Sequence, residues 1–504
     1  MDIILNADQS QRADRYTSEV IGIPSLVLME RAAVSACQEI ENGTYDLSDV
    51  LVVCGSGNNG GDGAAIARIL FEDGVSVRLY CCGSEEKYSS QMAVQMKALK
   101  KIGVPIDEDF KPDGATLLVD AIFGIGLKRE ITGHYAEVID GMNEACLPVV
   151  SIDMPSGIST DTGKVCGTAV EACTTVTFTG LKPGLCLYPG AQYAGKIAVK
   201  SAGIQVPDEI REQCYAYCIE EEDLSILKDR QKCGNKGTFG KVLVIAGSHD
   251  IFGAAYLAAS GAFSTGAGMV RIVTEEANRT ALYSLLPEAL FRFYSKDEVD
   301  FSFLEDDLDW ADSVLIGPGL GREQVSKRLL RSFLEANAGS RKGTVLDADA
   351  LNILAGEPDL FEKIVFPAVV TPHIGEMSRL TGKKISEIKE DLPGTAVQFA
   401  KERKVSCVLK DARTVTADPF GNIWLNLTGS DALAKAGSGD VLAGIAAGCI
   451  ARFAKCGQGT EEFMGLVGAL AAYLHGRCGQ EAGQKTSANT VLARDIIRYM
   501  AQYI

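Results

Sequence analysis

The sequence predicts an α/β protein built from two three-layer α/β/α domains. Both halves of the 504-residue chain repeat one order of segments: a short apolar run, a glycine-containing loop and an apolar stretch that is predicted to be helical. The run 49–54 precedes GSGNNGGDG, and the run 240–246 precedes GSHDIFGAA. Between the halves, residues 205–235 are polar and include the acidic cluster 220–223. We therefore expect the domains at 1–215 and 225–504.

Composition and charge exclude several classes of partner. The net charge of −17 argues against nucleic acid or an anionic membrane as the main partner. No apolar run approaches the roughly 20 residues of a membrane span, and the N-terminus MDIILNADQSQRADRY lacks the regions of a secretory signal. The 15 cysteines include no C-x-x-C pair, which indicates reduced thiols rather than a disulfide framework or a zinc ribbon. We expect a cytoplasmic protein.

The loop GSGNNGGDG is the candidate binding loop of the first half. It lies between a predicted strand and an apolar helix, which is the phosphate-binding order of doubly wound α/β folds. Its spacing matches neither G-x-G-x-x-G nor a Walker loop. Asn58, Asn59 and Asp62 add side-chain oxygens, which suit a hard cation near the phosphates. The alternative is an ordinary turn.

Two carboxylates follow further predicted strands of the first half. Asp120 and Asp153 each come after a short apolar run (116–119 and 148–152) and before a glycine-containing loop. Ligands of open parallel sheets bind beyond the carboxyl ends of the strands, which makes both side chains candidate site residues. The alternative is that each only caps a helix or a turn. Lys128 and Arg129, in the loop after Asp120, could balance ligand charge.

Three other features of the first half are predicted to be structural. Residues 8–40 should form helices with a break at 22–25, where Ser25 is suited to cap the second helix. His134 has no evident partner nearby. The tripeptide Lys182-Pro183-Gly184 is typical of a turn.

The second half contains further short apolar runs, each ending in a polar or glycine-rich loop. After 240–246 they are 313–316 before GPGLG, 344–346 before DADALN, 368–370 before TPHIGEMSRL and 405–409 before KDART. This alternation predicts a second sheet whose loops meet at one edge. His373 lies at one of these strand ends, which favours a ligand contact over the alternative of a satisfied loop histidine.

The stretch NLTGSDALAKAGSGDVLAG (426–444) is the strongest candidate site of the second half. A turn containing Gly437, Ser438 and Gly439 ends in Asp440, and the apolar residues that follow predict a helix. Glycine amides and a helix N-terminus both favour anions. A carboxylate beside such amides is suited to deprotonate a hydroxyl while a phosphoryl group arrives. The alternative is a helix N-cap, a role that Asp commonly fills.

Over roughly residues 1–210 the chain resembles the epimerase domain of the bifunctional NAD(P)H-hydrate repair enzymes. The motifs that carry the resemblance are GIPSLVLMERAA, NNGGDG, VDAIFGIGLKREITG and SIDMPSGI. It implies a Rossmann-like domain that interconverts the R and S hydrates of NADH and NADPH (NADHX and NADPHX), with K⁺ held by Asn59, Asp120 and Ser156. The hydrate contacts that it implies are Asn58, Asn59, Gly60, Gly61, Asp62, Gly124, Ile125, Gly126, Leu127, Lys128, Arg129, Glu130 and Asp153. We assign acid–base catalysis to Asp153, because epimerisation at a carbon that bears a hydroxyl and a ring nitrogen needs proton transfer.

Over roughly residues 230–502 the chain resembles the ADP- or ATP-dependent NAD(P)H-hydrate dehydratases, which have a ribokinase-like fold. GSHDIFGAA, IGPGLG, LDADALN, TPHIGEMSRL and the 426–444 stretch carry this resemblance. It implies that the S hydrate contacts Ala255, Gly319, His373 and Asp440, and that the nucleotide contacts Lys410, Asp411, Ala412, Arg413, Thr414 and Gly439. Relatives usually carry glycine where this chain has Asp411. The resemblance also implies Mg²⁺, for which Asn352 and Glu376 are candidate ligands.

Hydroxide leaves poorly, so the implied dehydration consumes a nucleotide. Asp440 is predicted to take the hydroxyl proton as the oxygen attacks the terminal phosphoryl group, with the amides of residues 437–439 stabilising the developing charge. Phosphate then departs, and loss of a neighbouring proton restores the dihydronicotinamide. By resemblance, the fusion of both activities favours ADP, which would give AMP and phosphate.

Two alternatives stay open at this point. The second half could be a ribokinase-like small-molecule kinase, which would release a stable phosphoester instead of free phosphate. The first half could be a non-catalytic nucleotide sensor, although Asn59, Asp120, Asp153 and Ser156 are all present. The expected partners are the hydrates and an adenine nucleotide, with no nucleic acid and no membrane. We also expect a homo-oligomer.

Overall fold

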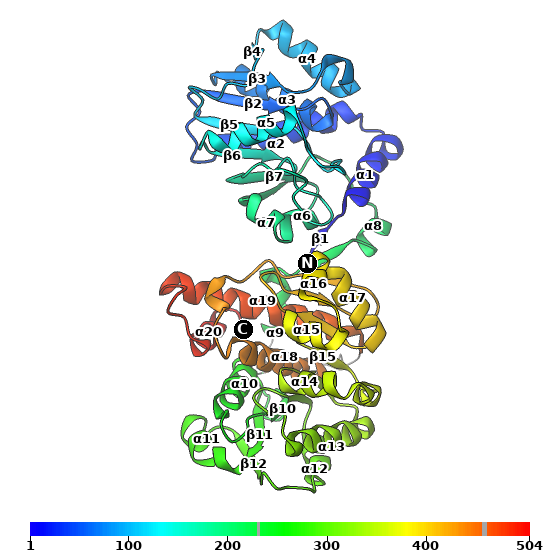
Figure 1. Cartoon of the computed structure of the whole chain (residues 1–504), viewed down its shortest axis with the longest axis vertical. Helices are drawn as coiled ribbons and strands as arrows, with labels where there is room; N and C mark the ends of the chain where they lie inside the picture. The colour runs from blue at the N-terminus through cyan, green and yellow to red at the C-terminus, as the bar shows by residue number, and fades with distance from the viewer. Residues whose placement is uncertain (229–231, 456–460) are drawn as a thin grey trace. The chain divides into compact units, whose positions relative to one another are not determined.

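The computed structural model describes residues 1–228, 232–455 and 461–504 (Figure 1). Residues 229–231, part of the polar junction 205–235, lie outside the described residues. The chain divides into two compact units, Asp2–Tyr217 and Cys218–Ile504 with Met1.

The first unit alternates strands and helices through most of its length. Its elements are β1 (Asp2–Ile4), α1 (Ala7–Arg15), a π-helical segment (Tyr16–Ile21), α2 (Ser25–Glu41), β2 (Val50–Cys54), α3 (Asn58–Glu72), β3 (Val77–Cys81), a 3-10 turn (Glu85–Lys87), α4 (Ser90–Ile102), β4 (Ile106–Asp107), β5 (Leu117–Ala121), α5 (His134–Glu144), β6 (Val149–Ile152), β7 (Thr174–Phe178), α6 (Pro183–Cys186), α7 (Gly190–Tyr193), β8 (Lys196–Lys200) and α8 (Asp208–Glu212), with β9 (Ala216–Cys218) at the boundary.

The sheet of the first unit is parallel, with strand order β4-β3-β2-β5-β6-β7-β8. The central strand β2 is apolar and wholly buried. Val50, Val52 and Cys54 belong to the core cluster formed with α2, α3 and α4, whereas Leu51 and Val53 belong to the cluster formed with α5. A strand covered by helices on both faces needs apolar residues at successive positions, as this one has.

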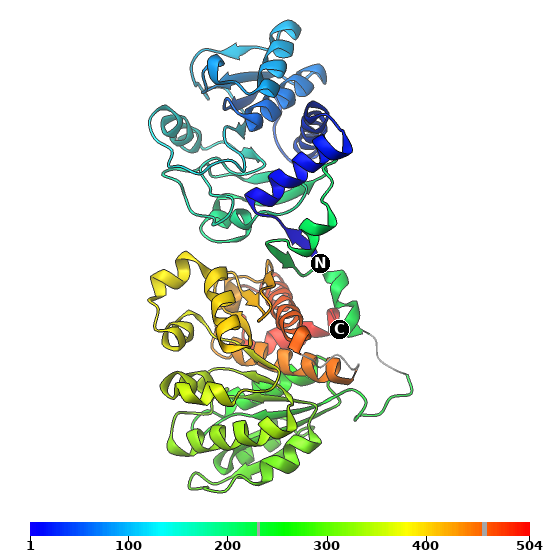
Figure 2. The ribbon, with the colours of Figure 1, turned by 90° about the vertical axis from the view of Figure 1, so that its right-hand side faces the viewer.

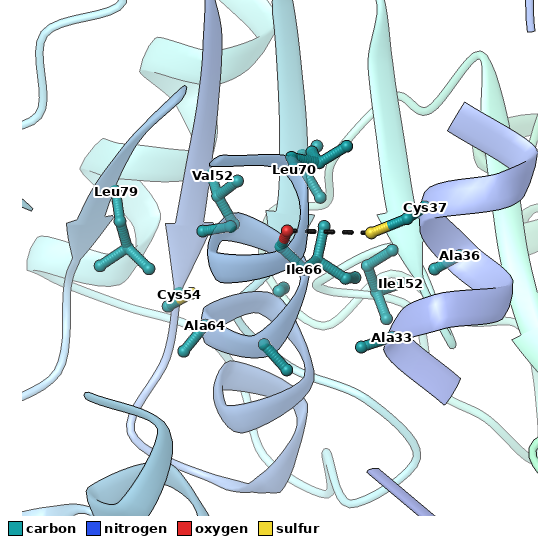
Figure 3. Close-up of a cluster of buried hydrophobic side chains, with 14 of the residues drawn as sticks. Ala33, Ala36, Cys37, Val52, Cys54, Ala64, Ile66, Leu70, Leu79 and Ile152 are labelled. Carbon is teal, nitrogen blue, oxygen red and sulfur yellow. Dashed lines mark hydrogen bonds between the residues drawn. The ribbon is translucent and has the colours of Figure 1, made fainter. Parts of the chain in front are cut away.

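Figure 3 shows the core between this sheet and its helices. Ala33, Ala36 and Cys37 of α2 lie beside Ile66 of α3, and the Cys37 thiol donates to the Ile66 carbonyl over 3.8 Å. Small side chains on α2 let the two helices approach closely, while larger residues such as Leu70 fill the space over the sheet. Each fully buried Leu or Ile contributes roughly 1.5–3 kcal/mol to folding.

The second unit follows the same alternation. Its elements are a 3-10 turn (Glu221–Leu224), α9 (Ser225–Lys228), β10 (Lys241–Ile245), α10 (Phe252–Ser264), β11 (Met269–Glu275), a 3-10 turn (Glu276–Asn278), α11 (Arg279–Leu285), β12 (Leu290–Tyr294), α12 (Phe303–Trp310), β13 (Ser313–Ile316), α13 (Gln324–Ser340), β14 (Gly343–Leu346), α14 (Asp349–Gly356), a 3-10 segment (Pro358–Lys363), β15 (Ala368–Val370), α15 (Ile374–Thr381), α16 (Ile385–Glu390), α17 (Leu392–Arg403), β16 (Ser406–Leu409), β17 (Val415–Ala417), β18 (Ile423–Leu425), a 3-10 turn (Asp431–Leu433), α18 (Ser438–Lys455), α19 (Glu461–Lys485), α20 (Ala493–Tyr499) and a 3-10 turn (Met500–Gln502).

In the second unit the strands follow the order β18-β17-β16-β15-β14-β13-β10-β11-β12. Neighbours from β16 to β12 are parallel, and β16, β17 and β18 pair antiparallel. Helices α10, α18 and α19 form one layer, and α12, α13 and α17 form the other (Figures 1 and 2). Helix α18 packs closely on α10, since a Cβ on Gly444 would lie 2.0 Å from the Ala258 carbonyl oxygen.

The predicted fold class of two α/β/α units is confirmed. The predicted strands agree with the observed ones to within one residue at each end, except that β5 extends to Ala121 and so contains Asp120. The predicted cap at Ser25 is wrong by one position, because α2 begins at Ser25 and Pro24 is its N-cap. Among the described helices, none is both long enough and apolar enough to cross a bilayer. The described cysteines are all free thiols.

Candidate functional site

A cavity of about 750 Å³ lies at the carboxyl edge of the first sheet. Its walls come from α1, the start of α2 and the segments that follow β2, β5, β6 and β7. Gly60, Gly61 and Glu130 do not line it: the two glycines are buried and Glu130 is exposed. The residues predicted from the sequence that do line it are Asn58, Asn59, Asp62, Gly124, Ile125, Gly126, Leu127, Lys128, Arg129 and Asp153.

The loop after β2 passes directly into α3, whose first two residues are Asn58 and Asn59. A Cβ on Gly60 would lie 1.9 Å from the Gly55 carbonyl oxygen, so the first turn of the helix can approach the loop only without a side chain there. Both polar atoms of the Asn59 side chain are buried and have no hydrogen-bond partner among the described residues. Buried amides are normally paired, which leaves Asn59 available to a ligand or a cation.

Asp120 is fully buried within β5. Its carboxylate accepts hydrogen bonds from the amide (2.8 Å) and the hydroxyl (2.6 Å) of Ser156, from the Ser151 hydroxyl (2.7 Å) and from the Ile122 amide (3.2 Å). Burial raises the pKa of Asp120, and these hydrogen bonds act in the opposite direction. The described residues thus give this carboxylate hydrogen bonds but no cation, which makes it a candidate metal ligand.

Asp153 lies just after β6 with a left-handed backbone (φ 66°), which is uncommon for a residue other than glycine. Its Oδ1 lies 2.9 Å from Lys182 Nζ and accepts from the Thr177 hydroxyl at 3.2 Å. Its Oδ2 faces Gly124: a Cβ built on Gly124 would lie 3.2 Å from this oxygen and 3.3 Å from Asn59 Oδ1. Asn59, Gly124 and Asp153 therefore lie together in the cavity wall.

A second acidic group, Asp62 of α3, lines the same cavity. Burial raises the pKa of Asp62 well above its ordinary value, and the charge of Asp153 adds to the increase. Asp14 of α1 also lines the cavity, and burial raises its pKa. The cavity thus contains Asp153, which is paired with Lys182, and two carboxyl groups, Asp62 and Asp14, whose pKa values are raised above the ordinary value. This combination is suited to acid–base chemistry.

The structure corrects one expectation and adds a residue in this unit. His134 was expected to lack a partner, but its Nε2 lies 2.8 Å from the Tyr80 hydroxyl, so it is structural and paired. Lys182 was missed as a site residue, because Lys182-Pro183-Gly184 indicated only a turn. It does precede the short helix α6, but its ammonium group is buried against Asp153. The one local signal was its position shortly after a strand end.

In the second unit, α18 begins at Ser438 and has Asp440 in its first turn. Gly437 precedes the helix with φ 86°, a conformation that suits glycine. A turn precedes a helix as predicted for the 426–444 stretch, but Ser438, Gly439 and Asp440, which were predicted to belong to the turn, lie in the first turn of α18. The carboxylate therefore lies where the helix dipole favours negative charge.

Lys410 lies beside the first turn of α18. Its Nζ donates to Asp347 Oδ1 at 2.9 Å, and the Thr371 hydroxyl donates to the same oxygen at 2.7 Å. A Cβ on Gly439 would lie 3.4 Å from this Nζ. Burial, and then the charge of Asp347, raise the pKa of Asp440 to about 7, while Lys410 acts in the opposite direction. Asp440 can therefore change its protonation near neutral pH, as a general base must.

His373 is the N-cap of α15. Its Nδ1 accepts from the amides of Gly375 (2.9 Å) and Glu376 (3.3 Å). Burial, followed by the charges of Lys410 and Arg379, lowers the pKa of His373, so the ring is neutral at pH 7. The side chain is 54% exposed. His373 thus combines a capping role with a surface that a ligand can reach.

The two candidate magnesium ligands already have partners. Asn352 Oδ1 accepts from Arg379 Nε at 2.9 Å, and Asn352 Nδ2 donates to Asp349 at 3.2 Å. Glu376 Oε2 accepts from the His373 amide at 2.8 Å, and burial raises the pKa of this glutamate. Over the described ranges, no three His, Cys, Asp or Glu side chains group as a metal site. These residues do not fit a magnesium site made by protein ligands alone.

The other predicted contacts of the second unit lie at neighbouring strand ends. Ala255 is buried in α10, and Gly319, which follows β13, packs against the start of that helix. Residues 411–414 form the turn between β16 and β17, where Asp411 is exposed. Arg413 Nη1 donates to a backbone carbonyl at 3.1 Å. The structure therefore brings Lys410, Gly439 and Asp440 together more closely than it does the rest of the predicted set.

Two residues near Asp440, Asp347 and His475, were given no role from the sequence. Asp347 belongs to the DADALN motif but received no role, although it is buried and paired with Lys410. His475 of α19 lies with Nε2 3.0 Å from the Ser438 hydroxyl, and burial lowers the pKa of His475 to about 4, so the ring is neutral. These pairs are 63 and 37 residues apart in sequence, so no local pattern could link them.

Two family models match the chain. Residues 25–184 match the model described as YjeF-related protein N-terminus, and residues 242–502 match the model described as NAD(P)H-hydrate dehydratase. The bifunctional NAD(P)H-hydrate repair enzyme of Moorella thermoacetica is 35% identical, over 99% of this chain and 96% of the relative. That of Escherichia coli is 34% identical, over 87% of this chain and 83% of the relative.

A solved structure matches the second half. It is the ADP/ATP-dependent NAD(P)H-hydrate dehydratase of Bacillus subtilis co-crystallised with ATP and Mg²⁺, which is 29% identical and covers 57% of this chain and 97% of that chain, with a TM-score of 0.47. The family is decided by the full-length relatives and by the dehydratase model, which spans more than half of the chain. The chain belongs to the family of bifunctional NAD(P)H-hydrate repair enzymes.

Proposed function

We propose that the chain carries two activities at two sites: the first unit interconverts the R and S hydrates of NADH and NADPH, and the second dehydrates the S hydrate. The observation that carries this proposal is that each unit has its own reactive carboxylate at the edge of its own sheet, Asp153 facing a cavity and Asp440 in the first turn of α18. The full-length similarity to bifunctional repair enzymes supports this pairing over a kinase joined to a non-catalytic sensor.

In the first unit, Asp153 and Asp62 supply the base and the acid. Asp153 Oδ2 takes the hydroxyl proton of the hydrate as the bond between that carbon and the ring nitrogen opens, and Asp62 gives a proton to the nitrogen. The nitrogen then adds to the other face of the carbonyl carbon, and both protons return. The pKa of Asp62, raised by burial, supports its role as the acid.

The donor set of the first unit fits a potassium ion. Asn59 has a buried amide oxygen without a partner among the described residues, and Asp120 is a buried carboxylate without a cation. The Ser156 hydroxyl already accepts from the Phe123 amide at 2.8 Å and donates to Asp120 at 2.6 Å, so it would contact the ion in addition to these bonds. Oxygen donors of this kind suit a hard cation. Asn59, Asp120 and Ser156 would hold the ion, which would supply positive charge beside the bound hydrate.

In the second unit, Asp440 takes the proton of the hydrate hydroxyl as this oxygen attacks the terminal phosphoryl group of the nucleotide. The amides of residues 437–439 and the Lys410 ammonium stabilise the charge on the transferring group. Phosphate then leaves with the oxygen, and loss of a neighbouring proton restores the dihydronicotinamide. The S hydrate contacts Ala255, Gly319 and His373, and the nucleotide contacts residues 410–414 and Gly439.

Magnesium would enter with the nucleotide phosphates, since this ion usually keeps several waters and few protein ligands. Asn352 and Glu376 are engaged by protein groups, so we assign neither to the metal. We further propose ADP as the phosphoryl donor, a homo-oligomeric state and a cytoplasmic location. The free thiols of the described cysteines support a reducing compartment.

The test is a time course of the purified chain with a mixture of R and S hydrates, K⁺ and Mg²⁺, with ADP, with ATP or without nucleotide. Chromatography resolves the two epimers, and free phosphate is measured in parallel. With the productive nucleotide, both epimers should be converted to the reduced cofactor with one phosphate released per turnover. Accumulation of a stable phosphoester would support a kinase instead.

A further inference from the structure

Lys182 has a nearly buried side chain, only 3% exposed, in the wall of the first cavity. Its Nζ lies 2.9 Å from Asp153 Oδ1 and donates to the Thr177 hydroxyl (2.6 Å) and the Phe178 carbonyl (2.7 Å). Two of the three N–H donors of the ammonium group are hydrogen-bonded to protein oxygens, and the charge contacts the Asp153 carboxylate. Because the side chain is almost wholly buried, we expect its effect on the site to act through the groups that it holds.

The Asp153–Lys182 pair is tied to the ends of two neighbouring strands. The Asp153 amide donates to the Val176 carbonyl of β7 at 2.7 Å, and Lys182 follows the same strand. Asp153 (φ 66°) and Thr179 (φ 71°) both have left-handed backbones, which persist only where the surroundings hold them. The pair is thus a rigid connection between the end of β6 and the end of β7.

The two oxygens of Asp153 face different groups. Oδ1 is held by Lys182 and the Thr177 hydroxyl, while Oδ2 faces Gly124. We propose that Lys182 is a positioning residue for epimerisation, which holds Oδ1 of Asp153 so that Oδ2 faces the hydrate. The inference rests on the proposed role of Asp153. Lys182 itself exchanges no proton: Oδ2 takes the hydroxyl proton and returns it after inversion.

Among the described residues that line the cavity, Lys182 is the one cation that contacts Asp153. The remaining charged groups that line it are Asp14 of α1, Asp62 of α3, and Lys128 and Arg129 of the loop after β5. Lys128 and Arg129 are exposed, and Asp14 and Asp62 are acidic. Removing the Lys182 ammonium therefore leaves Asp153 Oδ1 with the 3.2 Å hydrogen bond from the Thr177 hydroxyl and without its cation.

The experiment measures kcat and KM for epimerisation in Lys182→Met, with the exposed Lys164→Met as the matched control. Dehydration of pure S hydrate by the same chain reports the amount of active protein. We expect kcat to fall by about 10²-fold, the lower range of a general acid–base contribution. KM should stay within about twofold, since the Lys182 side chain is only 3% exposed and is held by protein groups. Lys164→Met and the dehydration rate should match wild type.

A second comparison uses the double variant Asp153→Asn with Lys182→Met. If Lys182 acts only through Asp153, the double variant should epimerise no more slowly than Asp153→Asn alone. A wild-type kcat in Lys182→Met, or a further tenfold loss in the double variant, would overturn the inference. Wild-type epimerisation by Asp153→Asn would overturn the proposed role of Asp153 instead, so the two failures are distinct.

Near-ultraviolet circular dichroism shows whether Lys182→Met folds. If it does not, Thr177→Val tests the positioning role instead. This variant keeps both charges and removes the hydroxyl that donates to Asp153 Oδ1 and accepts from Lys182 Nζ. The expected result is a fall in kcat of roughly 3- to 10-fold at unchanged KM, because one hydrogen bond to each member of the pair is lost. A wild-type kcat in this variant would contradict the positioning role.

Discussion

The two units place a lysine differently with respect to the reactive carboxylate. In the first unit Lys182 lies 2.9 Å from Asp153, whereas in the second unit Lys410 lies 2.9 Å from Asp347. Among the described residues, no lysine forms an ion pair with Asp440, and burial raises the pKa of Asp440 to about 7. A contact with a cation favours the charged form of a carboxylate, and burial disfavours it. The partner of the lysine, and not the presence of a lysine alone, therefore distinguishes the electrostatics of the two sites.

The largest expected effect is at Asp440. Asp440→Asn keeps the shape of the side chain but cannot accept the hydroxyl proton, so nucleotide-dependent dehydration should fall by about 10²–10⁴-fold. Epimerisation in the same chain should be unchanged, because that site belongs to the other unit. Asp431→Asn, at an exposed position in the same stretch, is the matched control. Retention of most of the wild-type dehydration rate would remove Asp440 from its proposed role.

The next largest effect is at the proposed cation site. Asp120→Asn removes the full charge from the three proposed potassium ligands while leaving an amide of similar shape. Loss of a residue that only hydrogen-bonds to a metal ligand typically costs about 10–100-fold in metal affinity. Loss of a ligand itself should therefore raise the potassium concentration needed for half-maximal epimerisation at least tenfold. Titration of epimerisation against potassium measures this, with the exposed Asp113→Asn as control. An unchanged potassium curve would contradict the site.

A smaller effect tests the electrostatic contrast directly. Because the pKa of Asp440 is about 7, its base form increases as the pH rises through 7, and dehydration should rise over the same range. Asp347→Asn removes a negative charge that raises this pKa and frees Lys410 to attract Asp440. The pH range over which the dehydration rate rises should therefore move down by about one pH unit. A kcat profile from pH 5 to 9 measures it, and a shift to higher pH would refute this account of Asp440.

The smallest effect concerns the hydrogen bond that holds Ser438, the first residue of α18, beside the proposed nucleotide site. Ser438→Ala removes the hydrogen bond to His475, which should cost about 0.5–1.5 kcal/mol in the free energy of unfolding of the second unit. Dehydration should change only a few-fold, because the backbone amides of the turn remain. Denaturant unfolding of this variant beside Ser430→Ala, an exposed serine of the same stretch, gives the comparison. Equal stability of the two variants would mean that the His475 contact contributes nothing.

Much of the fold could be predicted because its signals are local. Short, mainly apolar runs, each followed by a polar or glycine-containing loop, locate β2, β13 and β15 to within a residue, since a strand buried on both faces is apolar at successive positions. The run 148–152 places Asp153 at the end of its strand, and the glycine turn of the 426–444 stretch places Asp440 near a helix N-terminus. Asp120 was predicted to follow its strand but lies within it. The strand tolerates this polar residue near its end because the hydroxyl groups of Ser156 and Ser151 donate hydrogen bonds to the carboxylate.

The site residues that escaped prediction depend on contacts between distant segments. Lys182 meets Asp153 across 29 positions only because β6 and β7 are neighbours, and the turn residues around Lys182 indicate nothing about its ammonium group. Asp347 and Lys410 meet because β14, β15 and β16 are adjacent. Such pairings follow from strand order, which a single sequence does not reveal. They decide the electrostatics of both sites.

Mixing two variants that each lack one of the two proposed activities tests whether one chain carries two independent sites. Asp153→Asn should dehydrate the S hydrate and leave the R hydrate to its slow spontaneous inversion, while Asp440→Asn should interconvert the epimers and dehydrate neither. A time course resolving both epimers, with nucleotide present, is recorded for each variant and for their mixture. We expect that only the mixture converts both epimers completely to the reduced cofactor at a rate near wild type. Complete and equally rapid consumption of both epimers by Asp153→Asn alone would contradict it.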